Sequence, residues 1–391
     1  MSADGPALLV VDDNEDNRYT LTRRLTREGY TNLTIATNGR EALGLLQSKP
    51  FDLILLDIMM PEVNGYEVLE HMKADPGLRE IPVIMISALS EMDSVVRCIE
   101  LGAEDYLPKP FNPTLLRARV GASLEKKRLR DEVRASLARL EQEMGAARKL
   151  QLGMLPRSFP ACTPEQPVDV CAFIEPAREV GGDLYDFFYA ASQLFCFLIG
   201  DVSDKGASAA MFMARTRSLV RMAAALWSKN SDEKMTPGNV CEAVNRELCQ
   251  NNEDRMFVTL FLGLLDTRTG TMAYTNAGHP PPLLLRAGTV KRVEANPDMP
   301  LGVRSKTAYR TRALTLQPEN ALFIVTDGVI ETANSEGGFY TLERLSDDLQ
   351  AIANAPAAEL VATITDKVHA FAGAAPKADD ITILALRWRP A

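Results

Sequence analysis

The sequence predicts a doubly wound α/β domain with a five-stranded parallel sheet, then a long helical linker, then an α+β domain built as a β-sandwich flanked by helices. Five short apolar runs alternate with helical segments at the start of the chain. Residues 117–156 then contain no proline before the last position, and extended runs joined by turns follow. We place the three parts at residues 1–120, 121–155 and 156–391.

The strand candidates of the first part are rich in leucine and β-branched residues: Ala7–Val11, Leu33–Ala36, Leu53–Leu56, Val83–Ile86 and Asp105–Leu107. Strands that alternate with helices in this rhythm form a parallel sheet that is covered on both faces. Ligands of such sheets bind beyond the carboxyl ends of the strands, so the residues that follow each run are the candidates for function.

Acidic, hydroxyl and amino groups occupy those positions. Asp12 and Asp13 follow the first run and Asp57 the third, while Ser87 follows the fourth and Lys109 the fifth. Carboxylates within about 4 Å of one another repel by several kcal/mol per pair. A divalent cation that prefers hard oxygen ligands, Mg²⁺ or Mn²⁺, would balance them. With Lys109 and Ser87 to hold the phosphate oxygens, Asp57 is predicted to accept a phosphoryl group.

The first part resembles the receiver domain of two-component response regulators through VVDDNEDN, DLILLDIMMPEVNGYEVL, PVIMISALS and GAEDYLPKPF. The resemblance implies that a sensor histidine kinase phosphorylates Asp57. It also implies that Asp13, Asp57 and the Met59 carbonyl bind Mg²⁺ directly, with Asp12 acting through water. An ordinary helix N-cap is the alternative for Asp12, and a receiver that is never phosphorylated is the alternative for the domain.

The same resemblance assigns three further roles. Ser87 matches the switch hydroxyl, Lys109 the phosphate-binding lysine, and Tyr106 the aromatic side chain whose rotation reports phosphorylation. Simple packing is the alternative for Tyr106. The peptide bond between Lys109 and Pro110 is expected to be cis, as it is in that family.

The linker is predicted to be one charged helix on the order of 60 Å long. Its apolar residues form one stripe, at Val133, Leu137, Leu140, Met144 and Ala147. The stripe favours a homodimer through this helix, and a solvated spacer is the alternative. The segment AARKLQLGMLP resembles the one that opens the catalytic domain of SpoIIE-like phosphatases, where this helix acts as a regulatory lever.

The last part is predicted to contain two sheets with helices outside. Its extended runs are Val168–Phe173, Leu194–Gly200, Phe257–Leu265, Thr271–Thr275, Ala321–Thr326 and Ile381–Leu386. Its helical stretches are Ser208–Trp227, Gly238–Cys249, Leu342–Ala353 and Ala357–Ala372. Met211, Met213 and Met222 fall in an apolar helix and are expected to lie in the core.

Aspartates lie at the ends of runs here too, in VGGDLYDFF, IGDVSDKG, VTDGVIE and ADDITIL. Carboxylates from four separate segments, with no Cys–His cluster, indicate a binuclear site of hard metals that activates a water against a phosphate ester. Neither a G-x-S-x-G elbow nor a nucleophilic cysteine with an arginine-rich loop is present.

With NAGHPPPLLL and MPLGV, these motifs resemble the SpoIIE-like branch of the PP2C superfamily of metal-dependent Ser/Thr protein phosphatases. The resemblance implies two Mn²⁺ or Mg²⁺ ions. It assigns them the ligands Asp183, Asp201, Asp327, Asp379 and the Val202 carbonyl.

Several positions around that site carry a second interpretation. Asp186 and Asp380 are expected in an outer shell or at a third ion. Asp204 and Tyr340 depart from the pattern of the branch. Asp204 either tunes the metal site or is an exposed turn residue. Two residues keep two candidate roles each: Arg178, a phosphate clamp or a surface ion pair, and His279, a loop stabiliser or a proton donor.

The sequence therefore predicts a response regulator that controls dephosphorylation of a phosphoserine or phosphothreonine protein, and the resemblance implies an anti-sigma-factor antagonist as that protein. A pseudophosphatase adaptor, which binds a partner without hydrolysis, is the alternative. The net charge of −9 argues against nucleic acid as a partner. Because there is no membrane-length apolar run, we expect no membrane partner and a cytoplasmic protein. Activation and inhibition by Asp57 phosphorylation are both compatible with the sequence.

Overall fold

The computed structural model describes residues 5–88, 92–229, 236–293 and 296–390, and the side chains of residues 92–95 and 227–229 lie outside the description. The chain divides into two compact units, Met1–Leu140 and Glu141–Ala391. The division falls inside helix α5, Pro113–Met154. The boundaries drawn above at residues 120 and 155 therefore stay a prediction.

The first unit contains a five-stranded sheet in the order β2-β1-β3-β4-β5, with all neighbouring strands parallel. This confirms the predicted fold class and the five predicted strands. The elements are β1 Leu8–Val11, α1 Glu15–Arg27, β2 Leu33–Ala36, α2 Gly39–Ser48, β3 Leu53–Asp57, α3 Gly65–Ala74, β4 Val83–Ser87, α4 Met92–Glu100 and β5 Asp105–Pro108.

Alternating side chains of the buried strands feed two cores, one on each face of this sheet. Three helices begin at an asparagine, Asn14, Asn38 or Asn64, whose side chain accepts a hydrogen bond from a backbone N–H of the first turn. Such caps satisfy donors that a helix start otherwise leaves open. The turns after β1, β2 and β3 are thereby fixed. The turn after β1 carries Asp12 and Asp13, and Asp57 is the last residue of β3.

Helix α5 begins as part of the first unit's core, where Leu116 and Val120 are buried. Its charged side chains also contact other parts of the first unit: Lys127 Nζ lies 3.0 Å from Asp52 Oδ1, and Arg130 donates to the Glu80 carbonyl over 3.0 Å. Neither α5 nor any other helix within the described residues is long and apolar enough to cross a bilayer.

The second unit contains two antiparallel five-stranded sheets, β13-β10-β9-β8-β7 and β12-β11-β14-β15-β6. Its strands are β6 Val168–Glu175, β7 Leu184–Ala191, β8 Leu194–Val202, β9 Val258–Asp266, β10 Thr271–Ala277, β11 Leu283–Arg286, β12 Thr289–Arg292, β13 Arg312–Thr315, β14 Ala321–Val325 and β15 Ile381–Trp388. Its helices are α6 Ala207–Lys229, α7 Pro237–Leu248, α8 Asp327–Ile330, α9 Leu342–Ala351 and α10 Ala357–Ala372.

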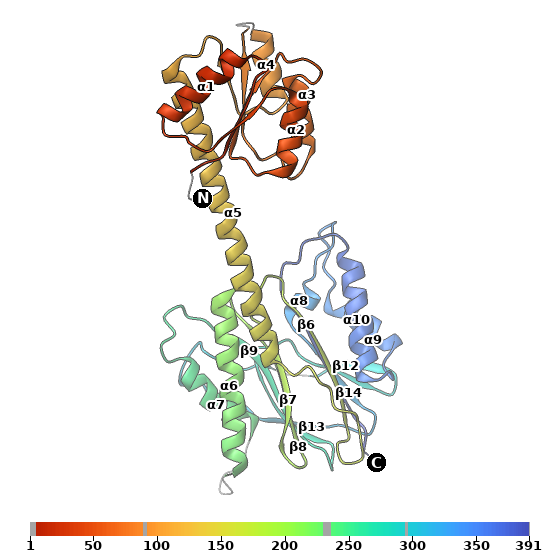
Figure 1. Ribbon diagram of the computed structural model, residues 1–391. Coiled ribbons are helices and arrows are strands. Elements are labelled where there is room, and N and C mark those ends of the chain that lie inside the picture. Colours follow the sequence, from red (N-terminus) through yellow and green to blue (C-terminus); the bar gives the residue numbers. More distant parts are fainter. Residues whose placement is uncertain (1–4, 89–91, 230–235, 294–295, 391) are drawn as a thin grey trace. The chain divides into compact units, whose positions relative to one another are not determined.

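The two sheets of this unit share one large apolar core, to which Phe197 of β8 and Leu384 of β15 both contribute. Figure 1 shows α6 and α7 in green beside the first sheet, and α9 and α10 in blue beside the second. A second core lies between the second sheet and the helices α9 and α10. The predicted sandwich with outer helices is confirmed.

Four strands were not predicted: β7, β11, β12 and β13. Strands β12 and β13 are short edge strands, TVKR and RALT, whose burial is low and whose sequences show no apolar alternation. The prediction that Met211 and Met222 of α6 lie in the core is also wrong, since Met211 is 73% exposed and Met222 is 54% exposed. Met213 is buried, as predicted.

Candidate functional site

Three carboxylates meet at the carboxyl edge of the parallel sheet. The register pairs Val11 of β1 with Leu56 of β3, so the residues that follow, Asp12 and Asp57, become neighbours. One oxygen each of Asp12, Asp13 and Asp57 lies within 4.8 Å of the others. Asp12 and Asp57 are buried and Asp13 is exposed. The fold therefore brings the three predicted carboxylates together.

Lys109 is the cation of this site. Its Nζ lies 2.9 Å from Asp12 Oδ2 and 2.9 Å from Asp57 Oδ1, but only the Asp57 contact has hydrogen-bond geometry. Asp12 Oδ2 is therefore buried without a hydrogen-bond donor among the described residues. Hard cations such as Mg²⁺ satisfy an oxygen of this kind. The donor set fits the ion that the family implies.

Burial raises the pKa of Asp57 to about 6, and Asp12 and Asp13 add to the shift while Lys109 opposes it. Burial alone would lower the pKa of Lys109, but the carboxylates of Asp57 and Asp12 outweigh it and the net shift is upward. At neutral pH Asp57 is therefore mostly the carboxylate, which is the form that attacks phosphorus.

We expect Asp57→Asn to stabilise the metal-free protein in a pH-dependent way. The pKa of Asp57 rises from 3.8 to about 6 on folding, so its ionisation destabilises the folded state. The difference from wild type should be absent below pH 4, grow as the pH rises through 6, and reach about 2–3 kcal/mol above it.

Chemical denaturation at several pH values measures this difference, and added Mg²⁺ should stabilise the wild type but not the variant. Asp16→Asn, on the exposed start of α1, is the matched control. A variant that shows the same difference at pH 4 and pH 8 would contradict the assignment.

The other predicted residues of this unit lie close by. Ser87 is buried at the end of β4, and the Lys109–Pro110 bond is cis, as expected. Tyr106 is half-buried on β5, with the Arg119 guanidinium 4.9 Å from its ring centroid. The switching role of Tyr106 and the Met59 carbonyl as a metal ligand stay predictions.

The second candidate site collects carboxylates from four segments of the second unit. Asp183 directly precedes β7, Asp201 lies in β8, Asp327 is the first residue of α8, and Asp379 and Asp380 directly precede β15. Asp183 and Asp380 are buried, and Asp201, Asp327 and Asp379 are half-buried. The antiparallel pairing of β14 with β15 brings the last two segments together.

Burial and neighbouring negative charges raise the pKa of Asp183, Asp201 and Asp327. Burial moves the pKa of Asp183 well above its usual range, and the charges of Asp201 and Asp380 add to this. Burial also raises the pKa of Asp201 to about 7, with Asp327 and Asp379 contributing. Burial and Asp379 raise the pKa of Asp327 as well. Acidic groups that repel in this way are stabilised by bound cations.

No three of these carboxylates place oxygens within 4.8 Å of one another in the part of the chain that is described. Asp201 interacts with Asp183, Asp327 and Asp379, and all of these groups offer hard oxygen ligands of the kind that Mg²⁺ and Mn²⁺ prefer. The donor set therefore fits the binuclear site that the family implies.

Asp380 holds the loop before β7 in place. Its carboxylate accepts hydrogen bonds from the N–H groups of Ala177, Gly182 and Asp183, over 2.7, 2.7 and 3.4 Å. A Cβ on Gly181 would lie 2.2 Å from Asp380 Oδ2. The predicted outer-shell role of Asp380 agrees with this geometry, because the carboxylate acts on the backbone that carries Asp183.

Two more glycines allow the segments to approach. A Cβ on Gly182 would lie 2.9 Å from the Val202 carbonyl oxygen, the predicted backbone ligand. A Cβ on Gly328 would lie 1.9 Å from the Asp380 carbonyl oxygen. Both contacts are too close for any side chain, so the glycines beside these aspartates have a packing reason.

Three residues at this site were missed by sequence reasoning. Thr326 Oγ1 donates to Asp183 Oδ2 over 2.8 Å, and Lys205 Nζ lies 2.9 Å from Asp379 Oδ2. Gln151 of α5 is buried, donates from Nε2 to the Gly181 carbonyl over 2.5 Å, and accepts from the Gly181 N–H over 3.2 Å. For Thr326 and Lys205, adjacency to the acidic motifs was a usable signal; the signal for Gln151 was its place in the segment AARKLQLGMLP.

Asp186 differs from the prediction. It lies inside β7, fully buried, and its carboxylate pairs with two arginines of α6, Arg217 at 2.9 Å and Arg221 at 2.5 Å. These ion pairs occupy its oxygens. Asp186 therefore joins α6 to the first sheet, and we assign it no metal.

Asp204 and Tyr340, the two departures from the family pattern, are each accommodated by local contacts. Asp204 has φ = 74°, in the left-handed region where glycine is unstrained, and its Oδ1 accepts from the Lys205 N–H over 2.8 Å. It is an exposed turn residue. Tyr340 is buried in the second core, where its ring packs edge-on against Phe371 and its hydroxyl donates to Asp348.

The structure favours one role for His279 and leaves Arg178 open. His279 is buried, its Nδ1 lies 3.1 Å from Thr259 Oγ1, and burial lowers its pKa to about 3. It is neutral and stabilises its loop. Arg178 is exposed, and its phosphate-binding role stays a prediction.

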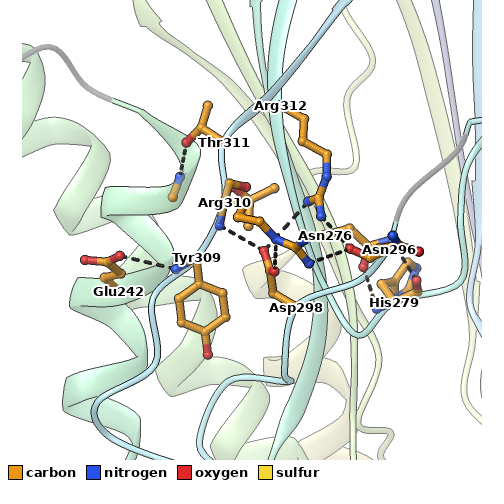
Figure 2. A network of polar contacts seen from close by, with 11 residues as sticks. Glu242, Asn276, His279, Asn296, Asp298, Tyr309, Arg310, Thr311 and Arg312 are labelled. Atoms are coloured by element: carbon orange, nitrogen blue, oxygen red, sulfur yellow. Dashed lines mark hydrogen bonds and ion pairs between the residues drawn. The ribbon is translucent and has the colours of Figure 1, made fainter.

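Figure 2 shows the polar network around Asn276, His279 and Asp298, the last of which directly precedes the MPLGV segment. Asn276 accepts from the His279 N–H over 2.8 Å, and its carbonyl accepts from the Asp298 N–H over 2.8 Å. The Asp298 side chain is 7% exposed and accepts from Arg310, whose Nε lies 2.6 Å from Oδ1. Arg312 is 3.7 Å from the same carboxylate.

We expect Asp298→Ala to destabilise the second unit by about 3 kcal/mol, because it leaves two arginines and a backbone N–H without their buried acceptor. The melting temperature of the metal-free protein measures the loss. Asp347→Ala, at an exposed position of α9, should melt like the wild type. Equal melting of Asp298→Ala and wild type would show that the network is not stabilising.

Comparison with known proteins supports the family resemblance predicted for each half of the chain. Residues 192–389 match the family described as Stage II sporulation protein E (SpoIIE), and residues 8–121 match the response regulator receiver domain. Protein IcfG of Synechocystis is 30% identical in an alignment 283 residues long that covers 65% of this chain and 42% of IcfG. The chain thus spans less than half the length of that relative.

Solved structures show the same fold for the second half. The RsbU and RsbW domains of a Mycobacterium tuberculosis protein are 29% identical with a TM-score of 0.50, over 57% of this chain and 61% of theirs. The SiaA-PP2C domain of Pseudomonas aeruginosa has a TM-score of 0.57 at 20% identity, over 65% of this chain and 99% of that domain. Since the SpoIIE match spans half of the chain, this protein belongs to the SpoIIE family and carries a response regulator receiver domain before its SpoIIE domain.

Proposed function

We propose that this protein is a response regulator whose output is metal-dependent dephosphorylation of a phosphoserine or phosphothreonine protein. The observation that supports the proposal most directly is the convergence of Asp183, Asp201, Asp327 and Asp379 from four segments of the chain, with Thr326 and Asp380 holding the segment that carries Asp183. A pseudophosphatase adaptor would have no need of this arrangement. The sequence retains all four carboxylates, which favours the enzyme over the adaptor.

In the phosphatase domain, Asp183, Asp201, Asp327, Asp379 and the Val202 carbonyl would hold two Mn²⁺ or Mg²⁺ ions. When bound, such ions acidify a water and balance the charge of a phosphate ester. Thr326 fixes the Asp183 oxygen that it hydrogen-bonds. Asp380 fixes the loop that carries Asp183. Arg178, exposed near that loop, is our candidate for binding the substrate phosphate.

In the receiver, Asp57 is the proposed phospho-acceptor, and Asp12, Asp13, Asp57 and the Met59 carbonyl would hold Mg²⁺. Lys109 lies where its ammonium group can neutralise a phosphoryl oxygen on Asp57. Ser87 would hydrogen-bond another oxygen, and Tyr106 would repack in response. A sensor histidine kinase is the proposed phosphate donor, by resemblance to the receiver family.

The substrate we propose is an anti-sigma-factor antagonist, by resemblance to SpoIIE-like phosphatases. We also propose a homodimer through α5. Its stripe is solvent-exposed in the single chain, with Val133 60%, Leu137 55% and Leu140 56% exposed. Polar substitutions at these positions should change how phosphatase activity responds to phosphorylation of Asp57. An unchanged response would make the helix a spacer.

Phosphatase turnover with and without a beryllofluoride mimic of the receiver phosphoryl group tests the coupling. Asp57→Ala is the control, because it removes the group that the mimic modifies. We expect the mimic to change the rate of the wild type and leave the rate of Asp57→Ala unchanged. If the wild-type rate does not change, the two domains are uncoupled.

A further inference from the structure

A cavity of about 290 Å³ opens beside the phosphatase carboxylates. Three segments line it: the end of β6, the turn after α8, and the loop from α10 to β15. Most of its walls are small and apolar, formed by residues such as Ala333, Ala372, Ala375, Pro376 and Ile381. Pockets that bind whole ligands start at about 300 Å³. This one has room for one or two side chains.

The cavity is continuous with the catalytic carboxylates. Asp379, a proposed metal ligand, forms part of its wall, and so does Gly328, which directly follows the proposed ligand Asp327. A phosphoresidue bound at the metal site therefore places its neighbours in the peptide chain at the mouth of the cavity.

The charged groups of the wall are paired with one exception. Glu175 Oε2 lies 2.7 Å from His369 Nε2, and its other oxygen lies 2.5 Å from Lys377 Nζ. Lys377 is thereby neutralised. Glu331 also lines the cavity and is exposed, and no cation pairs with it within the described residues. It is the carboxylate of the wall that remains available to a ligand.

Glu331 is held in position by the short helix α8. Its N–H donates to the Asp327 carbonyl over 2.8 Å, so its side chain starts one turn after the proposed metal ligand. Glu331 therefore lies in the wall of the cavity beside the proposed metal ligands.

We propose that this cavity is a specificity site that receives a lysine or arginine side chain next to the phosphoresidue of the protein substrate. The alanines, Pro376 and Ile381 would pack against the aliphatic stem, and Glu331 would pair with the cationic head. The inference rests on the proposed phosphatase function and adds a substrate preference to it. An acidic side chain is disfavoured because Glu331 and Asp379 would repel it.

Synthetic phosphoserine peptides with Arg, Leu, Glu or Gly at each neighbouring position test the preference, with p-nitrophenyl phosphate as a small substrate that has no flanking residues. At one or more positions, the wild type should hydrolyse the Arg peptide at least about fivefold faster than the Glu peptide, as judged by kcat/KM. Glu331→Lys should reverse that ratio, and Ala375→Trp should remove it by filling the cavity. Because each ratio is taken within one variant, a general loss of activity cancels.

Ala370→Trp is the matched control, an exposed alanine of α10 that does not line the cavity. It should keep the wild-type ratio. A wild type without preference, a preference for Leu, or an unchanged ratio in Glu331→Lys would overturn the specificity site while leaving the phosphatase intact. If the wild type with Mn²⁺ hydrolyses neither the peptides nor p-nitrophenyl phosphate, the proposed function itself fails.

Discussion

Asp327→Ala should lower phosphate release by more than about 100-fold, because loss of groups that merely support metal ligands already costs about 10–100-fold. The pKa of Asp327 is raised by burial and by Asp379, so at pH 8 its ionised form destabilises the metal-free fold. The variant should therefore melt no lower than the wild type when metal is absent. Loss of activity and retained stability together separate a metal ligand from a structural residue.

Turnover of p-nitrophenyl phosphate and of phosphoserine peptides with Mn²⁺ measures the first effect, and thermal melting in a chelator measures the second. Asp366→Ala, an exposed aspartate of α10, should behave like the wild type in both. Retained activity in Asp327→Ala would contradict the proposed metal site. A large loss of metal-free stability would instead make Asp327 structural.

Gln151→Leu should lower phosphatase activity by about 10–100-fold, although Gln151 touches none of the proposed metal ligands. Its amide bonds both the N–H and the carbonyl of Gly181, two residues before Asp183. A leucine would fit the volume but leave both backbone groups unsatisfied in a buried place. The loop would then shift, and Asp183 would shift with it.

The experiment compares kcat and the Mn²⁺ concentration for half-maximal activity in Gln151→Leu and in Gln142→Leu, the same change at an exposed position of α5. We expect the first variant to need more Mn²⁺ and the second to match the wild type. If both variants behave like the wild type, α5 does not position the metal site.

Site residues could be predicted where they lie at the end of an apolar run and the pairing of the strands brings those ends together. Asp12 and Asp57 follow apolar runs, and the parallel sheet brings the ends of those runs together whatever the details. The same holds for Asp327 and Asp379, which flank paired strands. Runs of this kind also predicted every strand that is buried on both faces and lacks an internal charge.

The features that could not be predicted depend on distant partners. Strand β7 was missed because Asp186 interrupts its apolar run. The Asp186 carboxylate can be buried because it forms ion pairs with Arg217 and Arg221, which lie far along the chain. Gln151 reads as one more polar residue of a charged helix, yet a backbone loop opposite it makes it buried. Met211 and Met222 lie in an apolar helix but on its uncovered side.

The backbone hydrogen bonds that the Asp380 carboxylate accepts have a consequence for how this domain can evolve. Because Asp380 binds the backbone at Gly182, leaves no room for a side chain at Gly181, and presents its carbonyl to Gly328, the three motifs VGGD, TDG and ADD form one mechanical unit. We therefore expect a substitution in one motif to change the effect of substitutions in the other two.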